Sequence, residues 1–212
     1  MKFACADPPY IGCGQSHYGH LHPEAAKWDD PASHVQLLHQ LIDEFPDGWA
    51  LCMHEPTLKI LMQHKPDDVR VGAWVKPFCR WRESVVPAYA WEPVFFKTTR
   101  WNGKQAGRDS VRDYVAANIN MDQSTPGAKP RAFWFWLFDV WCAEPADTFV
   151  DMFPGSGGGT VAWHEYTNTT RPGVVDTIPM FGDTAAWRCP TCASTTCSRV
   201  LKCEAVRYGR VT

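Results

Sequence analysis

Asp7-Pro8-Pro9-Tyr10 brings together, in four consecutive residues, the groups needed to hold an amino group that is attached to an aromatic ring. The Asp7 side chain and the Pro8 carbonyl are two acceptors for the two N–H donors of such a group, and Tyr10 offers a face on which its ring can stack. The prolines fix the backbone and keep these acceptors aimed. Alone, such a tetrapeptide is more often an ordinary tight turn, so it needs support from a second motif.

Thr148–Phe153 has the apolar character of a buried strand and runs into the glycine-rich stretch Pro154–Gly159. A strand that ends near an acid, here Asp151, and opens into glycines before a helix lets the backbone approach a nucleotide-like ligand in α/β folds. The glycines lack the spacing of the dinucleotide fingerprint, and no Gly-Lys-Ser/Thr follows them. The segment therefore favours a ligand without phosphates, with a glycine-rich surface turn as the alternative.

Taken together and in this order, the two segments resemble the amino-methyltransferases of DNA. Asp7–Tyr10 is similar to their catalytic motif, and Asp151–Gly157 is similar to their methionine-binding motif. Catalytic motif first and cofactor motif last is the permuted order of the family's beta class, in which a segment like Lys129-Pro130 precedes the cofactor strand. The resemblance spans roughly residues 3 to 166, with its strong matches at the two ends. Small methylases encoded by bacteriophages are similar in size and layout, so a phage origin fits.

This resemblance implies a Rossmann-like α/β fold: a mostly parallel, seven-stranded sheet with helices on both faces and S-adenosylmethionine across the carboxyl ends of the strands. The chain left after Gly159 is short, so one sheet edge is expected to be trimmed. The implied catalytic residues are Asp7, Pro8, Pro9 and Tyr10. The implied cofactor-binding residues are Asp151, Phe153, Pro154, Gly155, Ser156, Gly157, Lys129 and, for the ribose hydroxyls, Asp176, with Glu165 as a less well placed alternative.

The implied reaction is transfer of a methyl group to the exocyclic amino nitrogen of a DNA base that has been flipped out of the duplex. An aspartate in the first motif position favours adenine N6, because cytosine-N4 enzymes of the family more often carry serine there. Cytosine N4, RNA and the amide nitrogen of a protein glutamine remain alternatives. A different class of answer is a catalytically idle nucleic-acid-binding module that keeps a methyltransferase shell.

A polar, basic stretch at residues 98–129 is the expected substrate-recognition loop, since loops of this length are usually functional or disordered. A formal net charge of −2 gives no overall attraction to nucleic acid, so a local basic face is needed. Trp101 can stack on bases, and Lys76 can face the target pocket. The residues expected to meet substrate are Lys76, Arg100, Trp101, Lys104 and Arg108, with a solvated loop and a solvent-facing lysine as the alternatives.

Four of the nine cysteines gather near the end of the chain, at Cys189, Cys192, Cys197 and Cys203. The first pair has knuckle spacing and the second is wider than in a standard ribbon, so structural zinc and free thiols are both open. We therefore expect a methyltransferase domain at 1–186 and a cysteine-rich tail at 187–212. The other five cysteines are scattered singly, and the sequence shows neither a signal peptide nor a long apolar run. We therefore expect a cytoplasmic protein of a bacterial or phage-infected cell. We expect it to be a monomer or a homodimer.

The elements that must position these groups alternate between apolar runs and helical patterns. Alternation of this kind predicts an α/β sheet with parallel strands at its centre. The expected strands are 2–6, 49–53, 69–75, 92–97 and 148–153, and the expected helices are one capped by Ser33 and reaching Phe45, then 55–62, 131–142 and 160–166.

Overall fold

The computed structural model describes residues 1–79, 85–102, 110–119 and 127–169, and all of these fall within one unit of the chain, Met1–Asp176. The strands are β1 (Lys2–Ala6), β2 (Gly48–Cys52), β3 (Arg70–Val75), β4 (Trp91–Thr98), β5 (Tyr114–Ala116) and β6 (Thr148–Asp151). The α-helices are α1 (Pro31–Glu44), α2 (Glu55–Leu61), α3 (Arg131–Val140) and α4 (Gly158–Asn168). Shorter helical turns are η1 (Gly14–Tyr18), η2 (Ala25–Asp29) and η3 (Thr99–Asn102).

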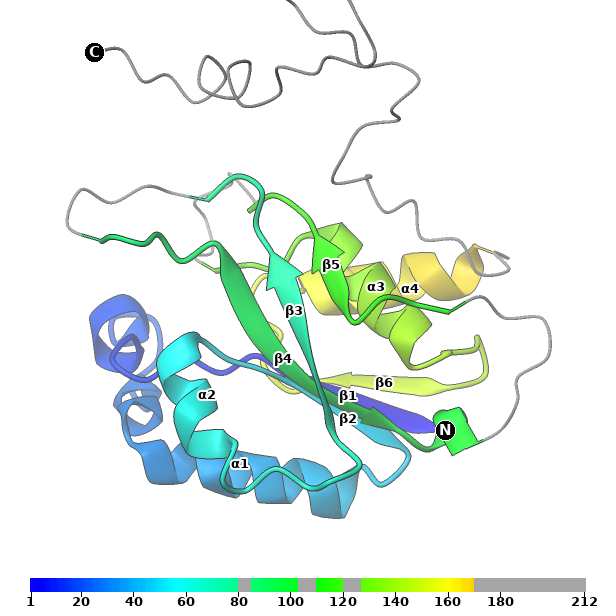
Figure 1. Ribbon diagram of the computed structural model, residues 1–212, viewed down its shortest axis with the longest axis horizontal. Helices are drawn as coiled ribbons and strands as arrows, with labels where there is room; N and C mark the ends of the chain where they lie inside the picture. Colours follow the sequence, from blue (N-terminus) through cyan, green and yellow to red (C-terminus); the bar gives the residue numbers. More distant parts are fainter. Residues whose placement is uncertain (80–84, 103–109, 120–126, 170–212) are drawn as a thin grey trace, which may run out of the picture. The chain divides into compact units, whose positions relative to one another are not determined.

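The six described strands form one sheet in the order β5-β3-β4-β2-β1-β6 (Figure 1). Strand β1 lies between β2 and β6 and is parallel to both. Strand β4 is antiparallel to both of its neighbours, β2 and β3, whereas β5 is parallel to β3. Five strands therefore run in one direction and β4 alone runs in the other, which confirms the expectation of a mostly parallel sheet.

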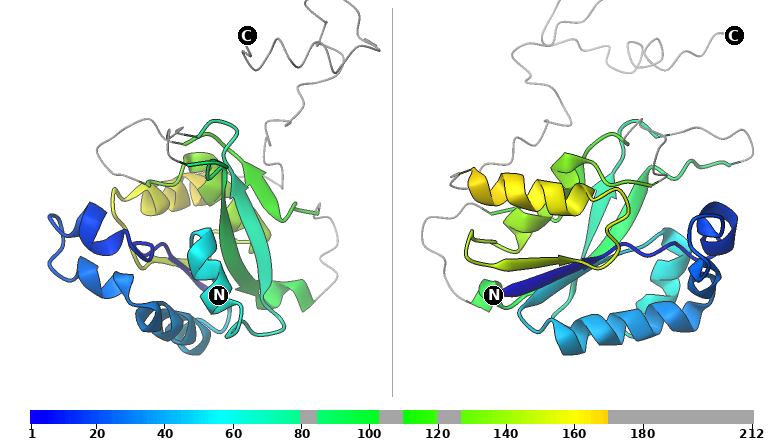
Figure 2. Two further views of the ribbon diagram at one scale, coloured as in Figure 1. Left: turned by 60° about the vertical axis from the view of Figure 1, so that its left-hand side comes forward. Right: turned by 180° about the vertical axis from the view of Figure 1, so that it is seen from behind.

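Helices cover both faces of this sheet, with α1 on one side and α3 and α4 on the other (Figure 2). Alternate side chains of β1 point to opposite faces, as the pleat of a strand requires. Ala4 and Ala6 pack in the core cluster that contains α1 and α2, while Phe3 and Cys5 pack in the cluster that contains α3 and α4. The architecture is the expected Rossmann-like α/β fold.

Helix α3 is buried on nearly all sides because it lies between the sheet and α4. Its sequence is apolar around the whole circumference, which is the pattern of a buried helix rather than of a surface one. The Phe138 ring shows this position: it lies 5.2 Å from the ring of Phe149 on β6 and 5.1 Å from that of Trp163 on α4. Much of the chain's aromatic content is therefore core, as expected.

Two features differ from the sequence-based expectations. Helix α1 begins at Pro31, and its cap is Asp30, whose carboxylate accepts the Ala32 N–H at 3.0 Å, rather than Ser33. Strand β5 lies inside the stretch expected to be a loop. Of its three residues only Val115 is buried, and the strand is too short to show a period. Pairing with β3, and not local pattern, makes this segment a strand.

Of the five scattered cysteines, Cys5, Cys52 and Cys79 are buried, as the sequence suggested, whereas Cys13 and Cys142 are partly exposed. Among the described helices, none combines the length and the apolar character needed to cross a bilayer.

Candidate functional site

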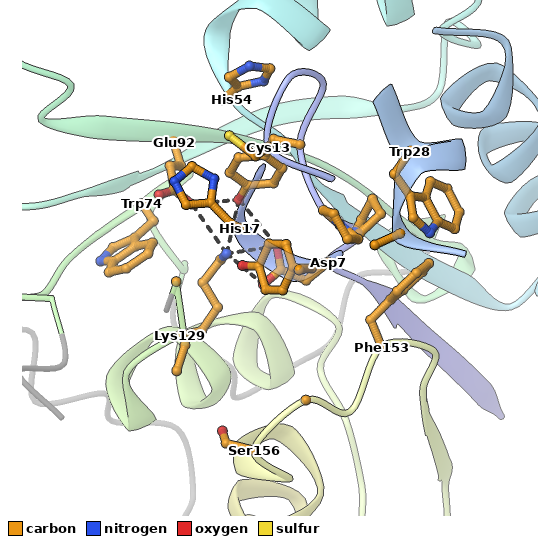
Figure 3. A pocket seen from close by; sticks show the side chains of 18 of the residues that line it. Asp7, Cys13, His17, Trp28, His54, Trp74, Glu92, Lys129, Phe153 and Ser156 are labelled. Atoms are coloured by element: carbon orange, nitrogen blue, oxygen red, sulfur yellow. Dashed lines mark hydrogen bonds and ion pairs between the residues drawn. The ribbon is translucent and has the colours of Figure 1, made fainter. Parts of the chain in front are cut away.

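The two sequence motifs meet because they follow neighbouring parallel strands. Asp7–Tyr10 comes directly after β1, and the glycine-rich loop comes directly after β6, with Cys5 paired to Asp151 in the sheet. Both segments line one cavity of about 1240 Å³ at the carboxyl ends of these strands (Figure 3). Ligands of open α/β sheets bind at this edge.

On one side of the cavity, Lys129 clamps the carboxylate of Asp7. Its ammonium group donates to both Asp7 oxygens, at 2.8 and 2.7 Å, and to the Tyr10 hydroxyl at 3.0 Å. The Lys129 side chain is only 2% exposed. A buried lysine is stable only when its charge is paired, and here the pairing also fixes the orientation of the Asp7 carboxylate.

Glu92, at the start of β4, extends this cluster to a second lysine. Its carboxylate accepts from the Tyr10 hydroxyl at 2.7 Å and from Lys76 at 2.6 Å, and it lies 3.2 Å from the Lys129 ammonium. Two carboxylates therefore balance two ammonium groups around the phenol of Tyr10. Dashed lines in Figure 3 mark the hydrogen bonds and ion pairs between the residues of this cluster that are drawn.

Burial and charge act against each other in this cluster, and the outcome differs from group to group. Burial alone would lower the pKa of Lys129, but the carboxylates of Asp7 and Glu92 outweigh it and raise that pKa well above its usual value. Burial would raise the pKa of Glu92, but Lys129 and Lys76 lower it to about 2. Burial raises the pKa of Tyr10 and so do the nearby carboxylates, which keeps this phenol a hydrogen-bond donor. For Asp7, burial raises the pKa and Lys129 opposes the rise.

Asp7 keeps capacity to bind a further donor. A carboxylate can accept about four hydrogen bonds. Asp7 takes two of these from Lys129, one on each oxygen. The Tyr10 hydroxyl also lies 3.2 Å from Oδ1, but its single proton is closer to Glu92, at 2.7 Å. One acceptor direction on Oδ2 is thus unused by the described residues. The ring of Tyr10 is itself fixed by stacking on His54, with centroids 5.2 Å apart.

On the other side of the cavity, the lining begins at Met152, directly after Asp151, which ends β6 as a partly buried acid and does not itself line the cavity. Burial raises its pKa to about 6, partly opposed by the Phe153 N–H that its carboxylate accepts at 3.2 Å. The loop that follows turns through Gly157, whose φ of +77° is a left-handed conformation favoured by glycine. Gly157 caps α4 and has no side chain to accept a hydrogen bond, so the first N–H groups of that helix lack a side-chain cap within the described part of the chain.

The first turn of α4 packs unusually close to the end of β6. A Cβ on Gly159 would lie 2.5 Å from Oδ2 of Asp151 and 3.0 Å from the Trp134 ring, so only glycine fits there. Trp134 lines the cavity from α3, and its buried indole N–H has no acceptor among the described residues. An unpaired buried donor is costly, and an acceptor on a bound ligand would remove that cost. This wall therefore suits a small ligand with both acidic and basic groups.

Arg100 and Trp101 lie away from the cavity, although both were expected to bind substrate. They follow the end of β4, and Thr98 there pairs with Gly48 at the amino end of β2, the opposite edge of the sheet from Asp7. Arg100 donates to both oxygens of Asp147 at 2.7 Å and to the Cys142 carbonyl at 2.6 Å. Since their polar groups serve the protein's own packing, we leave Arg100 and Trp101 out of the proposed site.

Trp101 has the same kind of structural role as Arg100. Its indole N–H donates to the Val140 carbonyl at 3.0 Å, and its ring meets Phe96 edge-on at 5.7 Å.

Two other expected substrate residues, Lys104 and Arg108, lie outside the described residues, as do Asp176 and the cysteines at 189, 192, 197 and 203. Within the described part of the chain, no group of three or more metal-ligating side chains comes together.

Sequence reasoning placed Lys129 with the cofactor and did not single out Glu92, Trp74 or Trp134. In the structure Lys129 donates hydrogen bonds to Asp7, and Glu92, Trp74 and Trp134 line the cavity. Glu92 did carry a signal, because it is an acid near the start of a strand whose centre, Val94–Phe96, is apolar. The two tryptophans had none that separates them from core residues, since both are almost fully buried.

No family model matches the sequence, and no curated protein matches it either. Among solved structures, the chain is similar to one described as the crystal structure of the M1.HpyAVI-SAM complex. The two share 15% sequence identity over 78% of each chain, with a TM-score of 0.44. A similarity this distant does not transfer a function, so the residues of the cavity must carry it.

Proposed function

We propose that this chain is an S-adenosylmethionine-dependent methyltransferase that acts on the exocyclic amino group of a DNA base, with adenine N6 as the preferred target. One observation carries the proposal: a clamped, partly free carboxylate at Asp7 and a glycine-rich ligand loop at Asp151 open into the same cavity from adjacent strands. A methyl transfer between two bound molecules needs such a pair of facing subsites.

The loop side of the cavity fits S-adenosylmethionine, which supplies an activated methyl group on its sulfonium. Its methionine part carries a carboxylate and an ammonium group. The uncapped N-terminus of α4 and the unpaired Trp134 N–H are donors for the carboxylate, and helix N-termini favour such anions. Asp151 is an acceptor for the ammonium group. The close packing at Gly159 keeps these groups together.

The Asp7 side of the cavity fits a base that carries an amino group. The unused acceptor on Asp7 and the Pro8 carbonyl would bind the two amino hydrogens, which turns the nitrogen lone pair toward the methyl donor. Lys129 holds Asp7 in place for this task. The chain therefore contributes positioning and electrostatics rather than a strong general base.

The preference for adenine rests on the aspartate at position 7. The assignment of DNA as the substrate rests on the resemblance of the two motifs to those of DNA amino-methyltransferases. Cytosine N4, RNA and protein glutamine present the same kind of amino group. The methylated product separates these targets, because the three nucleic-acid targets leave different methylated nucleosides and glutamine leaves a methylated amino acid.

The test is transfer of labelled methyl from S-adenosylmethionine to unmethylated duplex DNA, with the product nucleoside identified by mass. We expect N6-methyladenine from the wild type and none from Asp7→Asn. Asp67→Asn, which changes an exposed aspartate, is the matched control and should keep wild-type activity. Formation of N4-methylcytosine would show that the target base is cytosine rather than adenine. Absence of transfer to DNA, in a protein that binds the cofactor by calorimetry, would refute DNA as the substrate.

A further inference from the structure

Glu92 belongs to neither motif, yet it is the most connected acid of the cavity. It comes from β4, the one described strand that runs against the others, and its side chain is 13% exposed. It contacts Tyr10, Lys76 and Lys129 at 2.7, 2.6 and 3.2 Å. It does not reach the acceptor on Asp7 directly, so any effect on the reaction must act through these partners.

Glu92 is suited to be a fixed charge and unsuited to carry protons. With two ammonium groups beside it, its pKa falls to about 2. A proton released in the cavity would therefore not rest on this carboxylate at any pH near neutrality. The groups that face Glu92 or its partners are Asp7, Tyr10, Tyr18, Cys52, His54, Lys76 and Lys129.

The charges of the cluster balance only when Glu92 is present. With it, Lys76 and Lys129 face two carboxylates. Without it, Asp7 alone would face both lysines, and Lys76 would lose the carboxylate that it contacts at 2.6 Å. Both ammonium groups also lie over the face of Trp74, at 5.1 and 5.4 Å from its ring centre, which attracts them more weakly than a carboxylate does.

We propose that Glu92 is a positioning residue of the methyl transfer: it orients Tyr10 and offsets the charge of Lys76 and part of that of Lys129, so that Asp7 keeps an acceptor strong enough to bind the amino group. This inference rests on the proposed function. The inference deepens the proposed function, because it assigns the strength of the Asp7 subsite to Glu92 on β4 and to Lys76 directly after β3.

The first test compares wild type, Glu92→Gln and the double variant Lys76→Met/Glu92→Gln in single-turnover methyl transfer between pH 6 and 10. Glutamine keeps the shape and an acceptor for Tyr10 but removes the charge. We expect the single variant to be slower at pH 7 by roughly 10- to 100-fold, with little change in cofactor affinity, because misplacement of reacting groups costs about this much. Its rate should rise with pH, because loss of the Glu92 carboxylate lowers the pKa of Lys129, so that the excess positive charge beside Asp7 decreases as pH increases.

The double variant restores the charge balance with Lys129 and Asp7 alone, so it should recover most of the lost rate at pH 7. Two results would overturn the proposal: a wild-type rate and pH profile in Glu92→Gln, or an equal loss at every pH that Lys76→Met does not relieve. The second result would mean that Glu92 acts through packing only.

A second measurement decides the proposal without any methyl transfer. Nitrogen-15 labelling of the lysine side chains allows the charge of Lys129 to be followed by NMR as pH is raised from 6 to 10. In the wild type Lys129 should keep its charge over this range, and in Glu92→Gln its pKa should be lower, because one of the two carboxylates that raise it is gone. If the wild type transfers no methyl group, the proposed function fails on its own, while unchanged lysine titrations in the variant would separately refute the role of Glu92.

Discussion

Asp151→Asn should make the ligand-free protein more stable at neutral pH while weakening its binding of S-adenosylmethionine. The carboxylate is partly buried beside the first turn of α4, and burial raises its pKa to about 6. In the unfolded chain the same group has its usual pKa near 4. Because the folded pKa is the higher one, folding favours the protonated acid, and ionisation of Asp151 destabilises the fold.

The size of this effect follows from the difference between the two pKa values. A rise from 3.8 to about 6 corresponds to roughly 3 kcal/mol, at about 1.4 kcal/mol for each tenfold change in proton affinity. Because the side chain keeps some contact with solvent, we reduce the expected gain to about 1–2 kcal/mol. For a domain of this size that is a rise in Tm of roughly 3–7 °C. Asparagine keeps the acceptor for the Phe153 N–H, so no hydrogen bond is lost with the charge.

The assay is thermal unfolding of wild type and Asp151→Asn without cofactor, from pH 4 to pH 8. The destabilisation of the wild type begins as pH rises above about 4 and is complete above about 6, so the two proteins should melt alike at pH 4 and differ fully at pH 7.5. Calorimetry with S-adenosylmethionine should show the opposite order, with the variant binding more weakly.

Equal Tm values at pH 7.5, or a difference that is the same at pH 4, would refute the burial argument for Asp151. A more stable variant that binds the cofactor as tightly as the wild type would keep that argument but remove Asp151 from the ligand site. The wild-type affinity itself should fall below pH 6, by about tenfold for each pH unit, if only the ionised acid binds the ligand.

Three further substitutions test other contacts. Trp134→Phe removes the unpaired indole N–H and should weaken cofactor binding about tenfold by calorimetry, whereas Trp141→Phe, whose buried N–H is also unpaired among the described residues, should leave it unchanged. Gly159→Ala should lower Tm and weaken cofactor binding, with a stability cost of about 1–3 kcal/mol, because its Cβ would overlap the carboxylate at the end of β6; an unaltered affinity would show that the close approach is unimportant. Arg100→Met should cost about 2 kcal/mol in chemical unfolding, because Asp147 loses its two hydrogen bonds from the guanidinium and keeps the Met1 ammonium and the Glu144 N–H. It should not weaken DNA binding, and loss of DNA affinity without loss of stability would return Arg100 to the substrate surface.

Local pattern was enough to predict most of the elements. Residues 49–53 read as a strand covered on both faces, and the structure has β2 at Gly48–Cys52 with all five residues buried. Helix α3 reads as a helix because its aromatic residues recur at helical spacing, and its boundaries in the structure fall within two residues of the expected ones. β5 escaped prediction because three residues are too few to show a period, and only a neighbouring strand gives them their conformation.

The sequence also identified the two segments that form opposite sides of the candidate site. Asp7–Tyr10 and the loop after Asp151 each follow a strand, and parallel strands bring such segments to one edge of a sheet. That these two strands are neighbours is a property of the sheet order, which local pattern does not encode, and the structure supplies it through the pairing of Cys5 with Asp151.

The direction of β4 was decided only by tertiary structure, and it explains both what was missed and what was misplaced. An apolar run has the same pattern whichever way it enters a sheet. Because β4 runs against its neighbours, its first residues reach the carboxyl edge and carry Glu92 into the cavity, while its last residues reach the opposite edge and carry Arg100 to Asp147. The sequence determined that both residues are charged groups at the ends of a buried strand, and the pairing of that strand with β2 and β3 decided which of them lies beside Asp7.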